Sequence, residues 1–274
     1  LFEGRRYFPF ALIAGKFSGI DPLRILKIFE IETKFCEVSV GKNNSSKKRN
    51  FDIGLGQNNL LVIPGLIRDM LDSASPIYSP VFEFMTVCRD LETKEMLTLS
   101  EYLPRLEEEL SDNYDKNIDT TGEYYINALK APHICAFLVA YHIKRDQLLS
   151  VYSECQKFYK ESSSKLKKTF KLNVNIDPAE WADYSTYNGG PSRWKLVREY
   201  LRKQTANETI SRQLRNVVKA TVRRNLRAQR IARKNQILRG LVYDIEEDKI
   251  VKNDGTSKYG LYDFTSEFQQ GLLY

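Results

Sequence analysis

Ten basic residues and no acidic one lie between residues 212 and 239, which makes this segment the best suited to binding chemistry. Eight of the ten are arginines, whose planar guanidinium groups match phosphate better than the lysine ammonium does. Outside the segment, 32 Lys and Arg face 35 Asp and Glu, so the rest of the chain is about −3 although the whole is +7. A local cationic surface of this kind predicts a polyanionic partner. The basic residues are Arg212, Arg215, Lys219, Arg223, Arg224, Arg227, Arg230, Arg233, Lys234 and Arg239.

The first half of this segment also has the apolar spacing of a helix that packs on a core with one face. Beyond Leu226 the apolar stripe ends, and the remainder is cationic nearly all round. Like charges four residues apart on a helix each cost a few tenths of a kcal/mol, so something of opposite charge should offset them. The apolar stripe consists of Ile210, Leu214, Val217, Val218, Val222 and Leu226.

Three partners for the basic helix stay open. The first is phosphate or nucleic acid, and it predicts an RNA- or DNA-binding accessory component of a larger assembly. The second is an acidic protein, for which this chain would be a scaffold. The third is an acidic segment of the same chain, such as residues 107–109 or 246–248. Aromatic residues near cations are candidates for stacking on bases, although Trp194 and Tyr200 favour core positions. These candidates are Trp181, Tyr184, Tyr187 and Trp194.

A metal-dependent enzyme is a further class of function. Nucleases of the PD-(D/E)xK type place an Asp and an acidic-x-Lys motif on adjoining strands, where two carboxylates bind Mg²⁺. Asp21 and the Glu32-Thr33-Lys34 sequence have the residue types for this arrangement. A Mg²⁺ nuclease with Asp21, Glu32 and Lys34 is therefore one enzyme alternative.

A zinc site is the other enzyme alternative. Cys88, His133 and Cys135 would supply three ligands and leave the open position that catalytic zinc requires. Residues 210–250, with RQLRNVV followed by GLVYDI, resemble the C-terminal end of β-class carbonic anhydrases, which implies a zinc lyase. That family's Cys-x-Asp-x-Arg motif would need Arg at Glu92, and its His-x-x-Cys motif would need Cys at Ala136. The resemblance therefore does not carry the activity over.

Other motifs and targeting signals are sparse. The sequence contains no GxSxG, Walker A or GxGxxG pattern, and we expect no cofactor. The longest apolar run spans residues 134–141, far short of the about 20 residues that cross a bilayer, so we expect no membrane helix. Four cysteines without a CxxC pattern favour free thiols in a reducing, intracellular compartment.

The expected fold is α+β, with a β-rich N-terminal half and a helical C-terminal half that carries the long basic helix and a terminal β-hairpin. Residues 1–104 form the expected β-rich region and residues 105–274 the mainly helical region, as two domains or one continuous domain. The elements behind this expectation are strands at 8–14 and 25–40, a helix at 60–71, a hairpin at 81–99, a helix capped by Ser100, one or two helices at 133–160, a loop at 188–191, a helix capped by Ser192, and a hairpin at 241–251.

Overall fold

The computed structural model describes residues 6–37, 39–42, 51–81, 88–89, 96–111, 124–170, 177–234, 241–244, 249–252 and 258–259. The chain divides into two compact units. Unit 1 comprises Leu1–Tyr141 and Ile237–Tyr274, and unit 2 comprises His142–Gln236.

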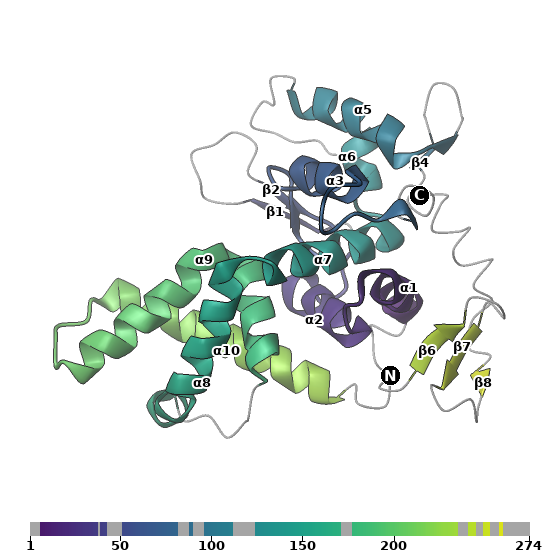
Figure 1. Ribbon diagram of the computed structural model, residues 1–274. Coiled ribbons are helices and arrows are strands. Elements are labelled where there is room, and N and C mark those ends of the chain that lie inside the picture. The colour runs from purple at the N-terminus through teal and green to yellow at the C-terminus, as the bar shows by residue number, and fades with distance from the viewer. Residues whose placement is uncertain are drawn as a thin grey trace. The chain divides into compact units, whose positions relative to one another are not determined.

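Unit 1 begins with two helices, α1 (Phe8–Ser18) and α2 (Pro22–Thr33), which pack side by side (Figure 1). Each has a proline in its first turn, where the missing N–H costs nothing. Asp21 caps α2, since its side-chain oxygen accepts a hydrogen bond from the Leu23 N–H at 2.9 Å. The predicted α+β fold with a β-rich N-terminal half is therefore wrong, because the described part of the chain is mostly helical. Nearly every residue of α1 is buried, so its apolar run has no solvent face to reveal a helical period.

The strands of unit 1 are two to four residues long and all pair antiparallel. The pairing of Cys88 with Leu97 closes a hairpin within the predicted span 81–99, and β6 pairs with β7 as predicted for the C-terminal hairpin. After α2, the elements of unit 1 are β1 (Val40–Lys42), β2 (Phe51–Ile53), β3 (Asn58–Asn59), α3 (Ile63–Leu71), β4 (Cys88–Arg89), β5 (Met96–Leu97), α5 (Leu99–Ser111), α6 (Tyr124–Ala128), most of α7 (Pro132–Gln147), β6 (Leu241–Asp244), β7 (Lys249–Lys252) and β8 (Lys258–Tyr259).

The cap of α5 is Thr98 rather than Ser100. The Glu101 carboxylate accepts hydrogen bonds from the Thr98 N–H and hydroxyl, both at 2.8 Å, and the Thr98 hydroxyl lies 3.4 Å from the Glu101 N–H. This is the reciprocal capping box of a Thr followed three residues later by Glu. The sequence contains that pattern, and Ser100 lacks an acidic residue three positions on.

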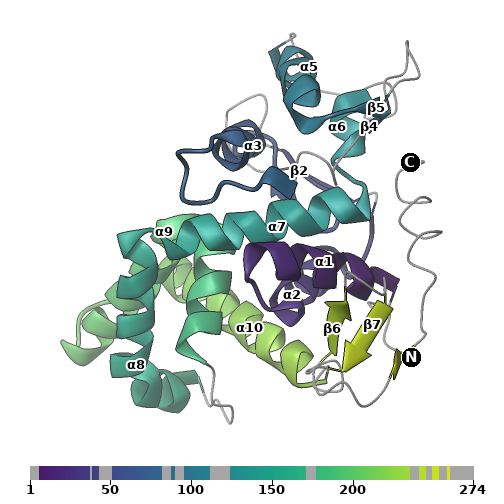
Figure 2. The same cartoon turned by 45° about the vertical axis from the view of Figure 1, so that its right-hand side comes forward.

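Unit 2 is built from α8 (Ser150–Phe170), α9 (Pro178–Thr205) and α10 (Arg212–Lys234), with α9 packed against both of the others (Figures 1 and 2). Helix α9 continues through residues 188–191, so the predicted loop and the cap at Ser192 are wrong. The cap is Asp177, which accepts hydrogen bonds from the N–H groups of Ala179 and Glu180. Buried anchors on both sides of the Gly-Gly-Pro sequence, Trp181 and Trp194, show how packing overrides weak local helix propensity.

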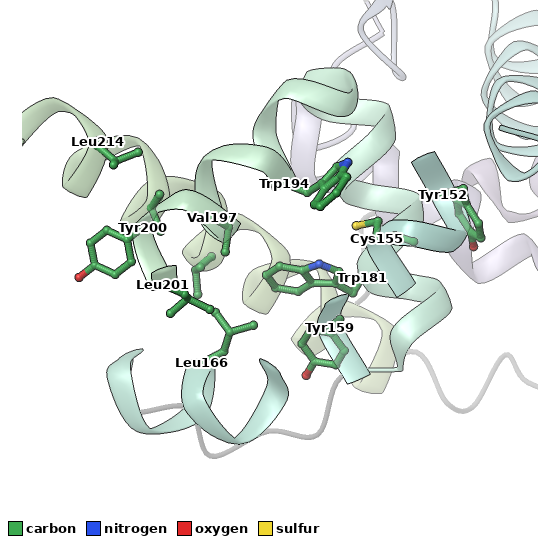
Figure 3. Packing of buried hydrophobic residues seen from close by; sticks show 13 residues of the cluster. Tyr152, Cys155, Tyr159, Leu166, Trp181, Trp194, Val197, Tyr200, Leu201 and Leu214 are labelled. Atoms are coloured by element: carbon green, nitrogen blue, oxygen red, sulfur yellow. The ribbon is translucent and has the colours of Figure 1, made fainter. Parts of the chain in front are cut away.

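The core of unit 2 is an aromatic and aliphatic cluster contributed by all three helices (Figure 3). The Trp181 ring is stacked on Tyr159 from α8, with ring centroids 4.8 Å apart. Leu214, Val218 and Val222 bring α10 into the same cluster, and Ile210 and Leu226 pack at its edge. The predicted apolar stripe is therefore confirmed for five of its six residues, and the sixth, Val217, is half-buried outside the cluster.

Candidate functional site

Helix α10 divides sharply into a packed face and a charged face. Leu214, Val218 and Val222 are at most 9% exposed, whereas the cations of the same turns are exposed. We define the outer face of α10 by its described exposed cations, which are Arg212, Arg215, Lys219, Arg223 and Arg224. The inner face fixes the helix, so the outer face is held as a preformed cationic surface.

The outer face carries its charges in a row. Arg215, Lys219 and Arg223 are four residues apart, and Arg212 precedes them by three, so the row extends about 16 Å at 1.5 Å per residue. None of these four side chains forms an ion pair with any residue that the structure describes. Neighbouring like charges on one helix face repel each other, and an anionic ligand would relieve that repulsion. Of the other predicted site residues, Arg227, Arg230, Arg233 and Lys234 continue the helix, and Arg239 lies outside the described residues.

Two of the three acidic residues at 107–109 are engaged within unit 1. Glu107 forms an ion pair with Arg68, and the Glu109 carboxylate accepts hydrogen bonds from the N–H groups of Tyr125 and Ile126 at 2.9 Å. Both sets of contacts lie within unit 1. Residues 246–248, the other acidic segment considered, lie outside the described residues. These contacts weaken the case for intramolecular pairing through residues 107–109.

The charge of the chain is divided between its two units. Unit 2 contains 22 Lys and Arg against 8 Asp and Glu, hence +14, and unit 1 is −7. Several acids of unit 2 have local tasks: Asp177 caps α9, Glu208 pairs with Arg202, and Glu199 pairs with Lys203. Asp146 and Asp183 are buried. The cationic surface is therefore a property of the whole helical unit, with α10 as its densest part.

Most of the aromatic residues considered for stacking belong to the core. Trp181 and Tyr184 are at most 1% exposed, so the stacking interpretation is wrong for these two, and the core positions predicted for Trp194 and Tyr200 are confirmed. Tyr187 is half-buried against the His142 ring, with centroids 4.8 Å apart. The burial of these aromatic side chains stabilises unit 2. Because they are buried or half-buried, they do not form an exposed stacking surface beside the cations that neighbour them in the sequence.

The nuclease arrangement is also wrong. Asp21 caps the start of α2 and Glu32 lies in its last turn, which separates them by about 16 Å along the helix axis. Neither belongs to a strand. Asp21 and Glu32 therefore cannot share a metal ion. Glu32 does lie next to a segment whose backbone adopts the left-handed conformation.

Left-handed residues gather at the end of α2. Lys34 and Phe35 have φ of 54° and 64°, and in the turn at 54–57 Gly54 and Gln57 have φ of 67° and 48°. Non-glycine residues in this region cost roughly 1 kcal/mol or more each and persist only where surrounding contacts hold them. The Thr33 hydroxyl lies 3.1 Å from the Leu55 carbonyl oxygen and joins the two segments.

Further contacts fix this junction on both sides. The Gln57 amide donates hydrogen bonds to the carbonyl oxygens of Ser39 and Gly54, both at 3.2 Å. The Tyr7 ring stacks on Phe35 at 5.6 Å between centroids. A Cβ on Gly54 would lie 2.7 Å from the Cys135 sulfur, so only glycine fits there. The Gly54-Leu55-Gly56 triplet indicates a turn in this part of the sequence, but nothing in it indicates the left-handed residues at the end of α2.

The zinc arrangement finds no support among the described side chains. His133 and Cys135 are two residues apart on α7, so they point in different directions. Burial raises the pKa of Cys135 to about 12 and lowers the pKa of His133 to about 4, and the Cys135 thiol lies 3.0 Å from the Leu129 carbonyl oxygen. Cys88 lies in β4. Across the described residues, no three His, Cys, Asp or Glu side chains are grouped to hold a metal ion.

Comparison with protein families, with curated proteins and with solved structures finds no match for this chain. Among the described helices, none is long and apolar enough to cross a membrane.

Unit 2 also contains a buried polar cluster where α7, α8 and α9 meet. Asp183 accepts a hydrogen bond from the Tyr152 hydroxyl at 2.7 Å. His142 Nε2 lies 3.8 Å from an Asp146 carboxylate oxygen, and both side chains are largely buried. Burial raises the pKa of Asp146 to about 6, with nearby Asp183 adding to the rise and the Thr186 hydrogen bond and Arg145 opposing it. Burial, with a contribution from Arg145, lowers the pKa of His142 to about 3, so this ring stays neutral above pH 4.

The Asp146→Asn variant is expected to be more stable than the wild type at pH 8. The folded state raises the pKa of Asp146, so the carboxyl favours folding at low pH, and this contribution is lost as the pH rises through about 6. We expect a gain of about 1–3 kcal/mol at pH 8 that shrinks by about 1–2 kcal/mol at pH 4.5. Urea unfolding at the two pH values measures this change. An equal gain at both pH values would show that the pKa of Asp146 is the same in the folded and the unfolded protein.

Proposed function

We propose that this protein binds a polyanion, RNA or DNA, through the outer face of α10. The observation that carries the proposal is the division of α10: apolar side chains anchor it in the core while Arg212, Arg215, Lys219 and Arg223 face solvent. These cations cannot be explained as packing residues, because none contributes to the buried cluster. The +14 charge of unit 2 would attract such a partner over longer range.

Phosphate suits this surface better than carboxylate. Three of the four cations in the row are arginines, which form two parallel hydrogen bonds to phosphate oxygens. The steps of about 6 Å between cations four residues apart let each side chain reach a separate group. A protein of this kind would act as an accessory component that holds nucleic acid within a larger assembly.

Salt dependence tests this function. We expect the full-length protein to bind a DNA duplex with an affinity that falls linearly on a log–log plot against salt. Five phosphate contacts predict a slope of about −4.5, because each contact releases about 0.9 counterion. Fluorescence anisotropy with a labelled duplex measures the slope. Affinity that stays flat between low and moderate salt would exclude phosphate binding as the main interaction.

A second candidate function is an enzyme in which Glu32 transfers protons. The observation that favours it is the strained junction beside Glu32, formed by Lys34, Phe35 and the turn at 54–57. Strain held in place by surrounding contacts is concentrated at functional sites. Glu32 lies in the last turn of α2 beside this junction, and its carboxylate could act as a general acid or base in cleaving glycosidic or phosphodiester bonds. This candidate needs Glu32 alone, unlike the Mg²⁺ nuclease with Asp21.

A further inference from the structure

The geometry of unit 2 points to double-helical nucleic acid as the partner, bound through its phosphates without stacking on its bases. This inference rests on the polyanion-binding function proposed above, and it selects one form of nucleic acid within that function. It follows from two observations on unit 2, the burial of its aromatic residues and the linear spacing of the outer cations of α10.

The first observation concerns aromatic side chains. Proteins that bind single strands without sequence preference combine a basic groove with exposed aromatic rings on which the bases stack. Unit 2 contains nine Phe, Tyr and Trp residues, all in the described part of the chain, and every one is buried or half-buried. Helix α10 contains no aromatic residue at all. The described surface of unit 2 therefore offers bases no fully exposed aromatic ring to stack on.

These rings are not available by a simple change of rotamer, because they hold unit 2 together. Trp181 stacks on Tyr159, Trp194 packs against Phe158 at 6.0 Å, and Phe170 packs against Tyr200 at 5.8 Å between ring centroids. Each pair joins α8 to α9. Turning one ring outward would open the interior that these helices share and would destabilise unit 2.

The second observation concerns charge density. The row from Arg212 to Arg223 extends about 16 Å. A duplex presents one phosphate per about 1.7 Å of its axis, whereas one of its strands presents one per about 3.4 Å. Over the length of this row, a duplex therefore presents about twice as many phosphates as one strand does. Since the aromatic rings of unit 2 are buried or half-buried, we expect this difference in phosphate density to favour the duplex.

The experiment compares probes that carry equal numbers of phosphates. The full-length protein is titrated at low salt into a short DNA duplex, an RNA duplex, and the single strands oligo-dT and oligo-dA. We expect either duplex to bind roughly 10-fold or more tightly than the single strands. Oligo-dA, whose bases stack more strongly, should bind no tighter than oligo-dT. Comparison of the DNA duplex with the RNA duplex shows which of the two nucleic acids the protein prefers.

Two results would overturn the inference, and only the second would also rule out the polyanion-binding function. Equal or tighter binding of single strands would show that bases are contacted after all, while the polyanion-binding function would stand. Failure of all four probes to bind at low salt would remove that function together with the inference.

Discussion

Replacing Arg215, Lys219 and Arg223 together by glutamine is expected to weaken duplex binding on the order of 100-fold at moderate salt. Each side chain would lose a charge-assisted contact with phosphate, worth at least about 1 kcal/mol. The salt slope should become shallower by about 3, one unit for each lost contact. Anisotropy titrations at several salt concentrations measure both quantities. Because these side chains are exposed and lie off the packed face of α10, the free energy of unfolding should change by less than about 0.5 kcal/mol.

The matched control removes three cations from another helix of the same unit. Lys157, Lys160 and Lys168 are exposed on α8, so their replacement by glutamine lowers the charge of unit 2 by the same amount. We expect this triple variant to bind within a few-fold of the wild type. If both triple variants lose affinity equally, the partner responds to the net charge of unit 2, and the assignment to the outer face of α10 is wrong.

Glu32→Gln is expected to abolish any polymer cleavage that the protein performs, with a rate loss of about 10²–10⁴-fold. The amide is nearly the same shape as the carboxylate but can neither supply nor accept the proton. Incubation with DNA, RNA and acidic polysaccharides, followed by chain-length measurement, reveals the activity of the wild type. The variant should keep the melting temperature of the wild type, since Glu32 lies at a helix end and outside the buried core.

Asp21→Asn is the control for this variant, because Asn caps a helix as well as Asp and removes only the charge. If Glu32 is the only residue that transfers protons, the Asp21→Asn variant should cleave at the wild-type rate. Cleavage that survives in Glu32→Gln, or no cleavage of any polymer by the wild type, would remove the enzyme as a candidate.

The parts of the fold that sequence patterns predicted are those with one apolar and one polar face. Residues 210–226 show that contrast, and Leu214, Val218 and Val222 are buried as their spacing predicted. The N-terminal helices lack it. In α2 even Lys27 is only 1% exposed, so buried positions do not alternate with solvent-facing ones at a helical period. The Asp21-Pro22 start signal was present in the sequence and outweighs the alternation that predicted a strand.

The candidate sites divide in a similar way. Cations that must face solvent are visible in a sequence because charge is rarely buried, and the outer face of α10 was predicted on that basis. The strained junction beside Glu32 was not predictable, since Lys34 and Phe35 adopt left-handed backbone without being glycine. Contacts from segments distant in the chain, Tyr7 and Leu55, hold them there. The zinc and nuclease arrangements failed because residue type alone does not show which side chains converge.

The free thiols give each unit its own built-in chemical reporter. Cys135 is buried in unit 1 and Cys155 in unit 2, and burial raises the pKa of each to about 12, so neither reacts while its unit stays closed. Cys36 is exposed and marks the rate at which an accessible thiol is alkylated. In a Cys88→Ser background, the alkylation rates of Cys135 and Cys155 measure how often each unit opens. The wild-type residues can thus show whether the cationic helical unit unfolds with the rest of the chain or independently of it.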